Sequence, residues 1–311
     1  MHGNSTLEKD PLFALMFGKA KAAVGDKVEK GCRKCHNPMW QPDTDTQVAS
    51  AEGVTCVVCH EVTDDHPKST LASGEAAAFD SKRAPDGAAQ ALCLSCHAVR
   101  KTGKGIDICV TGAENQHAGD AMCVNCHMPL SDGPPSMGSK ATQHRAHTVP
   151  GGHVASWVAG AAELSLEVDA VANEIVATIK PGALGHSLPT GNPMRHIILD
   201  LVATDAAGNE LWRNRPKGDP LLKQRESVFI RAFLNGEGKG PVPPFASSGE
   251  PDDNRLKNAT PHELRYPLPK GSAHLSATLV YRLAGDALLE EAKAPAHWRK
   301  PVEMGRVELE L

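Results

Sequence analysis

The sequence predicts an α + β protein of two domains, a loop-rich domain with short helices in residues 1–155 and an antiparallel β-sandwich in residues 156–311. Two observations predict this division. All nine cysteines and nine of the fifteen histidines lie within residues 1–150, where aliphatic runs are few. From Ala161 onward, apolar and polar residues alternate with the period of two that is typical of strands. A chain of 311 residues is long enough for both domains.

Four copies of the pentapeptide Cys-x-x-Cys-His organise the first half. Two thiols three residues apart can each form a thioether bond to one vinyl group of the same haem, and the adjacent histidine then reaches the iron. Structural zinc and redox disulfides also use Cys-x-x-Cys pairs, but neither requires a histidine after every second cysteine. The pattern therefore predicts four covalently bound haem c groups. The predicted attachment residues are Cys32, Cys35, Cys56, Cys59, Cys93, Cys96, Cys123 and Cys126, and the predicted proximal iron ligands are His36, His60, His97 and His127.

Composition and charge restrict the classes of partner. Aromatic residues are only 4% of the chain, so we expect the haems to supply the missing apolar bulk of the first half. The formal net charge is −4, and haem propionates would make the protein more acidic, so nucleic acid is not an expected partner. No segment approaches the roughly 20 apolar residues of a transmembrane helix.

The N-terminal 30 residues predict one helix, because Leu12, Leu15 and Ala20 share one face of a helical period. The four motifs then start 24, 37 and 30 residues apart, which favours short helices joined by haem-wrapping loops. Residues 72–91 and 131–140 are rich in small and turn-forming residues and predict loops. Cys109 is the cysteine outside the motifs, and we expect a small buried side chain, with an intermolecular disulfide or a special ligand as the alternatives.

The second half predicts at least six strands. They are expected around residues 164–168, 175–179, 197–203, 228–234, 275–283 and 302–311, with a hairpin that leads from the third of them to Leu211 and Trp212. Residues 286–294 predict a helix. This number and spacing of strands are typical of an immunoglobulin-like sandwich.

Four local patterns resemble the cytochrome c-554-like multihaem proteins. They are Met1-His2 ahead of Asp10-Pro11-Leu12-Phe13, then Gly53-Val54-Thr55, Cys126-His127-Met128-Pro129, and the loop Gly185-His186-Ser187-Leu188-Pro189-Thr190-Gly191 followed by Arg195. Several relatives carry another Cys-x-x-Cys-His upstream, so either this chain has lost a haem or its numbering begins inside a longer chain. The resemblance implies export, hence a periplasmic, extracellular or cell-surface location.

The second axial ligand of each iron decides the chemistry, because an open position binds small molecules and a second histidine closes it. The resemblance implies that His2 binds a neighbouring haem, that His66 binds the haem of Cys93–His97, and that His117 is a distal ligand, here of the first haem. The fourth haem is expected to use His144, His147 or His153, with His147 favoured over His153, and His186 is a further candidate. The expected distal set is His2, His66, His117, His147 and His153.

The favoured function is electron transfer along closely spaced, mostly bis-histidine haems. The expected partners are other redox proteins or copies of the chain itself, in a homo-oligomer, an extracellular filament or a membrane complex that the β-domain docks on. One alternative is an oxidoreductase that acts on a small nitrogen or sulfur compound at an open haem. Another is a binding module whose β half recognises a polysaccharide or a membrane redox complex, although nothing in the β sequence names a ligand.

Overall fold

The structure is a computed structural model that describes residues 2–4, 6–38, 53–59, 86–115, 123–134, 140, 142–215 and 225–311. Contacts divide the chain into two compact units. The motif unit comprises Met1–Arg100, Gly119–Gly151 and Ala287–Ala294, and the β unit comprises Lys101–Ala118, Gly152–Asp286 and Pro295–Leu311. These units are defined by contacts between residues, whereas a domain is a part of the chain that folds on its own. The predicted domains, residues 1–155 and 156–311, therefore stay a prediction.

The motif unit is built mainly from helices. Its elements are η1 (His2–Asn4), α1 (Pro11–Val24), α2 (Lys27–His36), α4 (Cys56–Cys59), α5 (Asp86–His97), α7 (Cys123–His127), β3 (Leu130–Asp132) and β4 (Gln143–Arg145). The predicted N-terminal helix is α1. It begins where Asp10 accepts a hydrogen bond from the Phe13 amide at 2.9 Å and ends at Gly25, whose φ is 77°.

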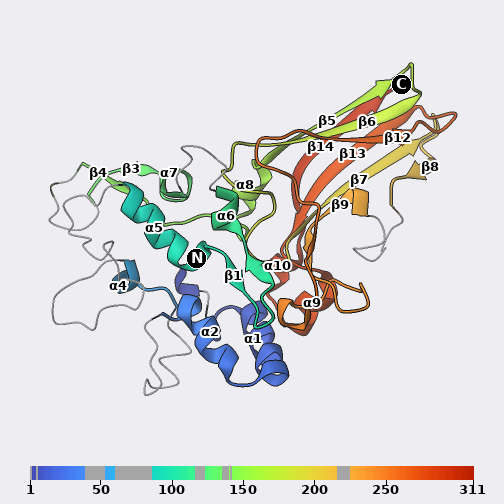
Figure 1. The fold of residues 1–311 in the computed structure, drawn as a ribbon. Helices are drawn as coiled ribbons and strands as arrows, with labels where there is room; N and C mark the ends of the chain where they lie inside the picture. The colour runs from blue at the N-terminus through green and yellow to red at the C-terminus, as the bar shows by residue number, and fades with distance from the viewer. Residues whose placement is uncertain are drawn as a thin grey trace, which may run out of the picture. The chain divides into compact units, whose positions relative to one another are not determined.

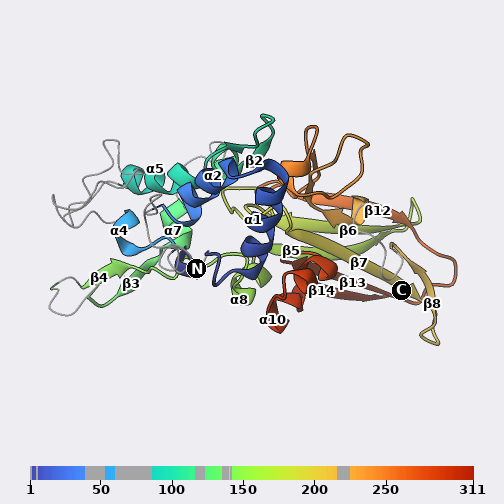
Figure 2. The same cartoon turned by 90° about the horizontal axis from the view of Figure 1, so that it is seen from below.

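Helices α1 and α2 lie side by side in both views (Figures 1 and 2). Arg33 of α2 is buried, forms an ion pair of 3.1 Å with Glu29 one turn earlier, and places its guanidinium 5.9 Å from the centre of the Phe17 ring. The contact combines apolar packing with a cation–π interaction. It fixes the helix that carries the first motif against α1.

The two larger sheets of the β unit are antiparallel (Figure 1). One has the strand order β12-β6-β5, and the other has β14-β13-β7-β8, with β9 also paired to β7. These strands are β5 (Ala162–Asp169), β6 (Glu174–Pro181), β7 (His196–Thr204), β8 (Glu210–Arg213), β9 (Val228–Phe229), β12 (His262–Pro267), β13 (His274–Arg282) and β14 (Val302–Glu310).

Short elements complete the chain. They are β1 (Arg100–Lys101), β2 (Asp107–Cys109), α6 (Thr111–Asn115), α8 (Ala155–Ala159), η3 (Arg225–Ser227), β10 (Arg231–Ala232), η4 (Pro244–Ala246), β11 (Asp252–Asp253), α9 (Asp286–Glu291) and α10 (Ala296–Arg299). Strand β1 pairs with β2, β3 with β4, and β10 with β11.

Both sheets contribute to one hydrophobic core. Ile175 and Ile179 of β6, Leu199 of β7 and Leu279 of β13 all have no exposed surface. Alternate residues of β7 and β13 point into this core, as the period of two predicts. Each such side chain contributes about 1.5–3 kcal/mol of burial free energy, so the β unit has a core of its own.

The predicted strands and the helix at 286–294 are found, with two differences. Residues 228–234 form two short strands, β9 and β10, that pair in different sheets. Strand β12 was not predicted, because its Glu263 and Arg265 are charged and its alternation is short; it pairs with β6 at the edge of its sheet. The immunoglobulin-like topology stays a prediction. Within the described residues, no helix combines the length and apolar character that a membrane span requires.

Candidate haem-binding site

Short helices carry the cysteine motifs. Helix α2 ends at His36, α5 at His97 and α7 at His127, and α4 runs from Cys56 to Cys59. Residues three and four positions apart share one face of a helix, so the first, third and fourth motifs each present two thiols and an imidazole to the same side. The eight described cysteines form no disulfides, and Cys109 lies half-buried in β2, outside these helices. His60 lies outside the described residues.

Thiols of different motifs lie in hydrogen-bond contact. The Cys35 thiol accepts a hydrogen bond from Cys96, which lowers the pKa of Cys35 to about 6. The Cys123 thiol accepts one from Cys93, which lowers the pKa of Cys123 to about 7. The first motif therefore meets the third, and the third meets the fourth.

The packing of the motif unit fits large apolar groups. Among its described residues, the buried apolar side chains are few: Leu12, Phe17, Ala20, Val58, Val124, Leu289, Ala292 and Ala294. The motif cysteines and histidines whose side chains are described are half-buried or exposed, with Cys126 and His97 exposed. A unit with so small a core needs additional buried surface, and a haem macrocycle offers more of it than any side chain.

Two of the predicted proximal histidines are oriented by neighbouring groups. The Phe13 ring stacks on the imidazole of His36, with ring centroids 3.9 Å apart and planes 7° from parallel. Nδ1 of His127 lies 2.7 Å from the carbonyl oxygen of Pro150. Because a carbonyl oxygen only accepts, this contact puts the proton on Nδ1 and the lone pair on Nε2, as a metal-binding imidazole requires.

The fourth motif helix is fastened by Arg145. Its Nη1 donates to the carbonyl oxygens of Val124 and Met128, each at 3.1 Å, and its Nη2 donates to Oδ1 of Asn125 at 3.3 Å. Carbonyl groups at a helix C-terminus lack partners inside the helix, so the guanidinium caps α7. Sequence reasoning missed this role, since only the pairing of β3 with β4 brings Arg145 to α7.

The rings of His2 and His97 lie near each other, with their planes tilted by 44°. Their ring centroids lie 6.2 Å apart, and burial lowers the pKa of His2. Metal–imidazole bonds are about 2.0 Å, so two imidazoles on opposite sides of one metal have centroids roughly 6.3 Å apart. The separation therefore fits two axial ligands of a single iron.

The other predicted distal ligands are placed as follows. His66 and His117 lie outside the described residues. Nδ1 of His144 lies 3.0 Å from the carbonyl oxygen of Gly133 in the motif unit, where His147 is exposed. His153 belongs to the β unit, where its ring lies 4.5 Å from that of Trp298. Nothing here tests which of them binds iron, so their roles stay predictions.

The loop from Gly185 to Gly191 is held within the β unit by Glu114 of α6. Glu114 Oε2 accepts hydrogen bonds from the Ser187 amide at 3.2 Å and the Thr190 hydroxyl at 2.9 Å. Glu114 Oε1 accepts one from Arg255 Nη2 at 2.5 Å, and Arg255 Nη1 donates to the Pro189 carbonyl at 3.1 Å. The loop is therefore an anchor for α6 as well as a tight turn.

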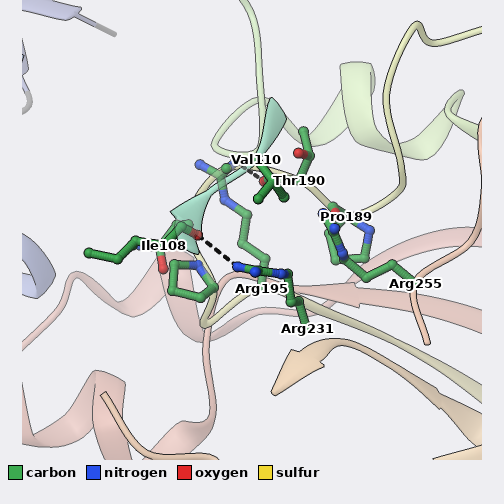
Figure 3. A pocket seen from close by; sticks show the side chains of 10 residues that line it. Ile108, Val110, Pro189, Thr190, Arg195, Arg231 and Arg255 are labelled. Atoms are coloured by element: carbon green, nitrogen blue, oxygen red, sulfur yellow. Dashed lines mark hydrogen bonds between the residues drawn. The ribbon is translucent and has the colours of Figure 1, made fainter. Parts of the chain in front are cut away.

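A small cavity adjoins this loop (Figure 3). Arg195, Arg231 and Arg255 line it together with Pro189 and Thr190. Its volume is about 10 Å³, which is room for a single water molecule. This cavity is too small to hold an organic substrate.

Similarity to known proteins agrees with the motif chemistry. A family model described as cytochrome c554 and c-prime matches residues 5–61. The crystal structure of a penta-heme cytochrome c552 from Thermochromatium tepidum is similar, with a TM-score of 0.74 and 27% sequence identity. These matches support a multihaem c-type cytochrome. The structural match covers 100% of this chain and 94% of that chain. No curated protein matches the chain.

In a multihaem c-type cytochrome, each cysteine pair holds one haem and the histidine of the motif binds its iron, which carries an electron as Fe(II) and releases it as Fe(III). The similar chain is a penta-heme protein, whereas the present sequence contains four Cys-x-x-Cys-His motifs. The first, third and fourth motifs lie in the described part of the chain, so their cysteines and histidines would each hold one haem there. Of the second motif, the described side chain that would hold haem is that of Cys59.

Proposed function

We propose that this protein transfers electrons through four covalently bound haem c groups, most of them with two histidine ligands. Each of the four motifs would attach one haem. The polypeptide holds these groups at fixed separations, keeps small molecules from the irons and sets the potentials through the axial ligands.

The observation that carries this proposal is the contact between thiols of different motifs. Cys35 meets Cys96, and Cys93 meets Cys123. Since each thiol lies at the edge of its own haem-attachment site, three of the four attachment sites adjoin one another. Adjoining sites favour transfer from one haem edge to the next.

The pairing of His2 with His97 supports a closed iron at the third motif. A closed iron changes its oxidation state without binding a substrate, which favours a carrier over an enzyme. For the other three irons we propose His117, one histidine of His144, His147 and His153 with His147 favoured over His153, and His66, which the resemblance had assigned to the third haem.

Two measurements on the purified holoprotein test the proposal. Intact-protein mass spectrometry should show the mass of four haems, and low-temperature electron paramagnetic resonance of the oxidised protein should show low-spin signals from bis-histidine irons. A strong high-spin signal that changes on addition of cyanide or nitric oxide would contradict the carrier function and favour an oxidoreductase acting on a small nitrogen or sulfur compound.

We further propose that the protein is exported, to the periplasm or to the cell surface, and that its partners are other redox proteins or copies of itself. Haem attachment to Cys-x-x-Cys-His outside the inner membrane in the resembling cytochromes supports export. Assembly into an extracellular filament is the sharper form of this proposal. Cryo-electron microscopy of purified material should then show polymers, and dispersed monomers with every iron closed in cis would contradict it.

A further inference from the structure

Phe13 of α1 lies against the imidazole that the first motif offers to iron. The ring centroids of Phe13 and His36 are 3.9 Å apart, and the two planes are 7° from parallel. Both residues belong to the motif unit, so the contact lies inside one compact unit. The phenyl ring therefore covers one face of the imidazole.

The start of α1 fixes the backbone position of Phe13. Oδ1 of Asp10 accepts a hydrogen bond from the Phe13 amide at 2.9 Å. Pro11 occupies the start of the helix, where its fixed φ is suitable, and Leu12 is buried, with 4% of its surface exposed. In the sequence Asp10-Pro11-Leu12-Phe13, three residues thus hold the fourth in place.

A second contact between α1 and α2 fixes the alignment of the two helices. Phe17 follows Phe13 by about one turn of α1. Arg33 precedes His36 by about one turn of α2, and its guanidinium lies 5.9 Å from the centre of the Phe17 ring. Glu29 holds this guanidinium through an ion pair of 3.1 Å. A shift of either helix by one residue would break this contact and move Phe13 away from His36.

The stack leaves the metal-binding nitrogen of the imidazole open. An imidazole binds a metal through a lone pair that lies in the plane of its ring, so a second ring stacked on that plane does not cover the lone pair. The stacked ring does oppose rotation of the imidazole about the metal–nitrogen bond. This rotation affects the iron, because the angle between the two imidazole planes of a bis-histidine haem sets the energies of the d orbitals of Fe(III).

We propose that Phe13 is a positioning residue for His36, and that it fixes the plane of this imidazole and thereby the electronic state of the first haem. The inference rests on the proposed function, since it takes His36 to be an iron ligand. The face of a phenyl ring also attracts positive charge. An imidazole bound to Fe(III) is more electron-poor than one bound to Fe(II), so the stack stabilises the oxidised haem and lowers its midpoint potential.

The test compares the oxidised Phe13→Leu, Phe13→Tyr and parent holoproteins by electron paramagnetic resonance and by spectroelectrochemical titration. Leucine is apolar but has no planar face, so in Phe13→Leu one low-spin signal should move to different g values or broaden, and one midpoint potential should rise. Tyrosine keeps the aromatic face, so Phe13→Tyr should keep the g values of the parent protein.

The matched control is Phe17→Leu, which removes an aromatic ring from the same helix. Phe17 is 9% exposed and Phe13 is half-buried, so the control should lose at least as much stability in denaturant unfolding as Phe13→Leu. Its g values and potentials should nevertheless match those of the parent protein. A purely structural role of Phe13 would not separate the two variants in this way.

The inference is overturned if Phe13→Leu has the g values and potentials of the parent protein, or if Phe17→Leu changes them equally. Haem content by mass and the low-spin signals of the parent protein are measured first. Missing haem or absent bis-histidine signals in the parent protein would contradict the proposed function and this inference with it. Full haem content and low-spin signals, together with an unchanged Phe13→Leu spectrum, would contradict only the role of Phe13.

Discussion

The imidazole rings of His2 and His97 have centroids 6.2 Å apart and planes tilted by 44°. His2 precedes every motif in the chain, and the carbonyl oxygen of His2 also accepts a hydrogen bond from the Val54 amide at 3.4 Å. The first residues of the chain therefore lie beside the second and the third motifs. Among the predicted distal ligands, His2 is therefore the one for which the described structure offers the most direct geometry.

Replacing His2 by methionine should raise the potential of one haem by on the order of 0.1 V, because axial ligands set haem potentials across about 0.8 V. Spectroelectrochemical titration measures the shift. The low-spin bis-histidine signal of the same haem should be lost from the paramagnetic resonance spectrum.

The control for His2 is His274→Met, since His274 is an exposed residue of β13 in the β unit. This variant should leave every potential unchanged. A His2→Met protein whose titration and spectrum match those of the control would remove His2 from the ligand set.

Replacing His117 by methionine should likewise raise the midpoint potential of one haem, because a thioether ligand stabilises Fe(II) more than an imidazole ligand does. The haem that responds should differ from the one that responds to His2→Met. If the double variant shifts only one haem, the two histidines cannot be ligands of different irons.

His196 predicts a pH dependence of stability in the β unit. Burial lowers the pKa of His196 from 6.5 to about 4, and the positive charge of Arg282 lowers it further, while the Met194 carbonyl, 3.0 Å from Nδ1, and Asp286 act in the opposite direction. The unfolded chain binds a proton at His196 below pH 6.5, whereas the folded chain binds it only near pH 4. Stability from this residue is therefore complete above pH 6.5 and is lost as the pH falls toward 4.

The free energy of unfolding should fall by up to about 3 kcal/mol across that interval because of His196 alone. Denaturant titrations of the holoprotein at several pH values measure it. In the variant His196→Gln, the free energy of unfolding should depend less on pH over this interval, whereas His274→Gln should show the same pH dependence as the parent protein. If the free energy of unfolding depends on pH equally in the parent protein and in both variants, His196 does not titrate as its burial indicates.

The local spacing of residues explains which features were predictable. Cys-x-x-Cys-His is a pattern within about one helical turn, so the sequence alone predicts the attachment residues, and these stay a prediction. Alternation within strands likewise predicted the inward faces of β7 and β13. The resemblance, rather than any pattern of spacing, pointed to His2.

Features formed by distant segments had no local signal. Glu114 and Arg255 are 141 residues apart in the sequence. Arg145 and Val124 are also distant in the sequence and become neighbours only when the chain folds. Each side chain alone is an ordinary polar residue, and its role exists only after two elements have packed. The contacts of residues 101–118 group them with the β unit, and no local pattern in the sequence indicates this grouping.

The ion pair between Glu114 and Arg255 should contribute strongly to the stability of the β unit. The side chains are 13% and 5% exposed, and their atoms are 2.5 Å apart. Removing one partner of a buried pair typically costs about 3–5 kcal/mol, because the other charge stays buried. Asp253 also accepts a hydrogen bond from Arg255, so Glu114→Gln should cost less than that, about 2–3 kcal/mol.

A double-mutant cycle of Glu114→Gln and Arg255→Met isolates the pair. Thermal and denaturant unfolding should give a coupling energy of about 2 kcal/mol, in the range for residues in one network. The matched control is the exposed pair Glu303 and Arg306 on β14, for which the same cycle should give less than about 1 kcal/mol.

Because Glu114 also holds Ser187 and Thr190, Glu114→Gln should loosen the loop at Gly185–Gly191, and hydrogen exchange of the Ser187 amide should accelerate. A coupling energy no larger than that of the control would mean that α6 is held by the loop's other contacts, such as Asn115 with the Gly185 carbonyl, and not by this pair.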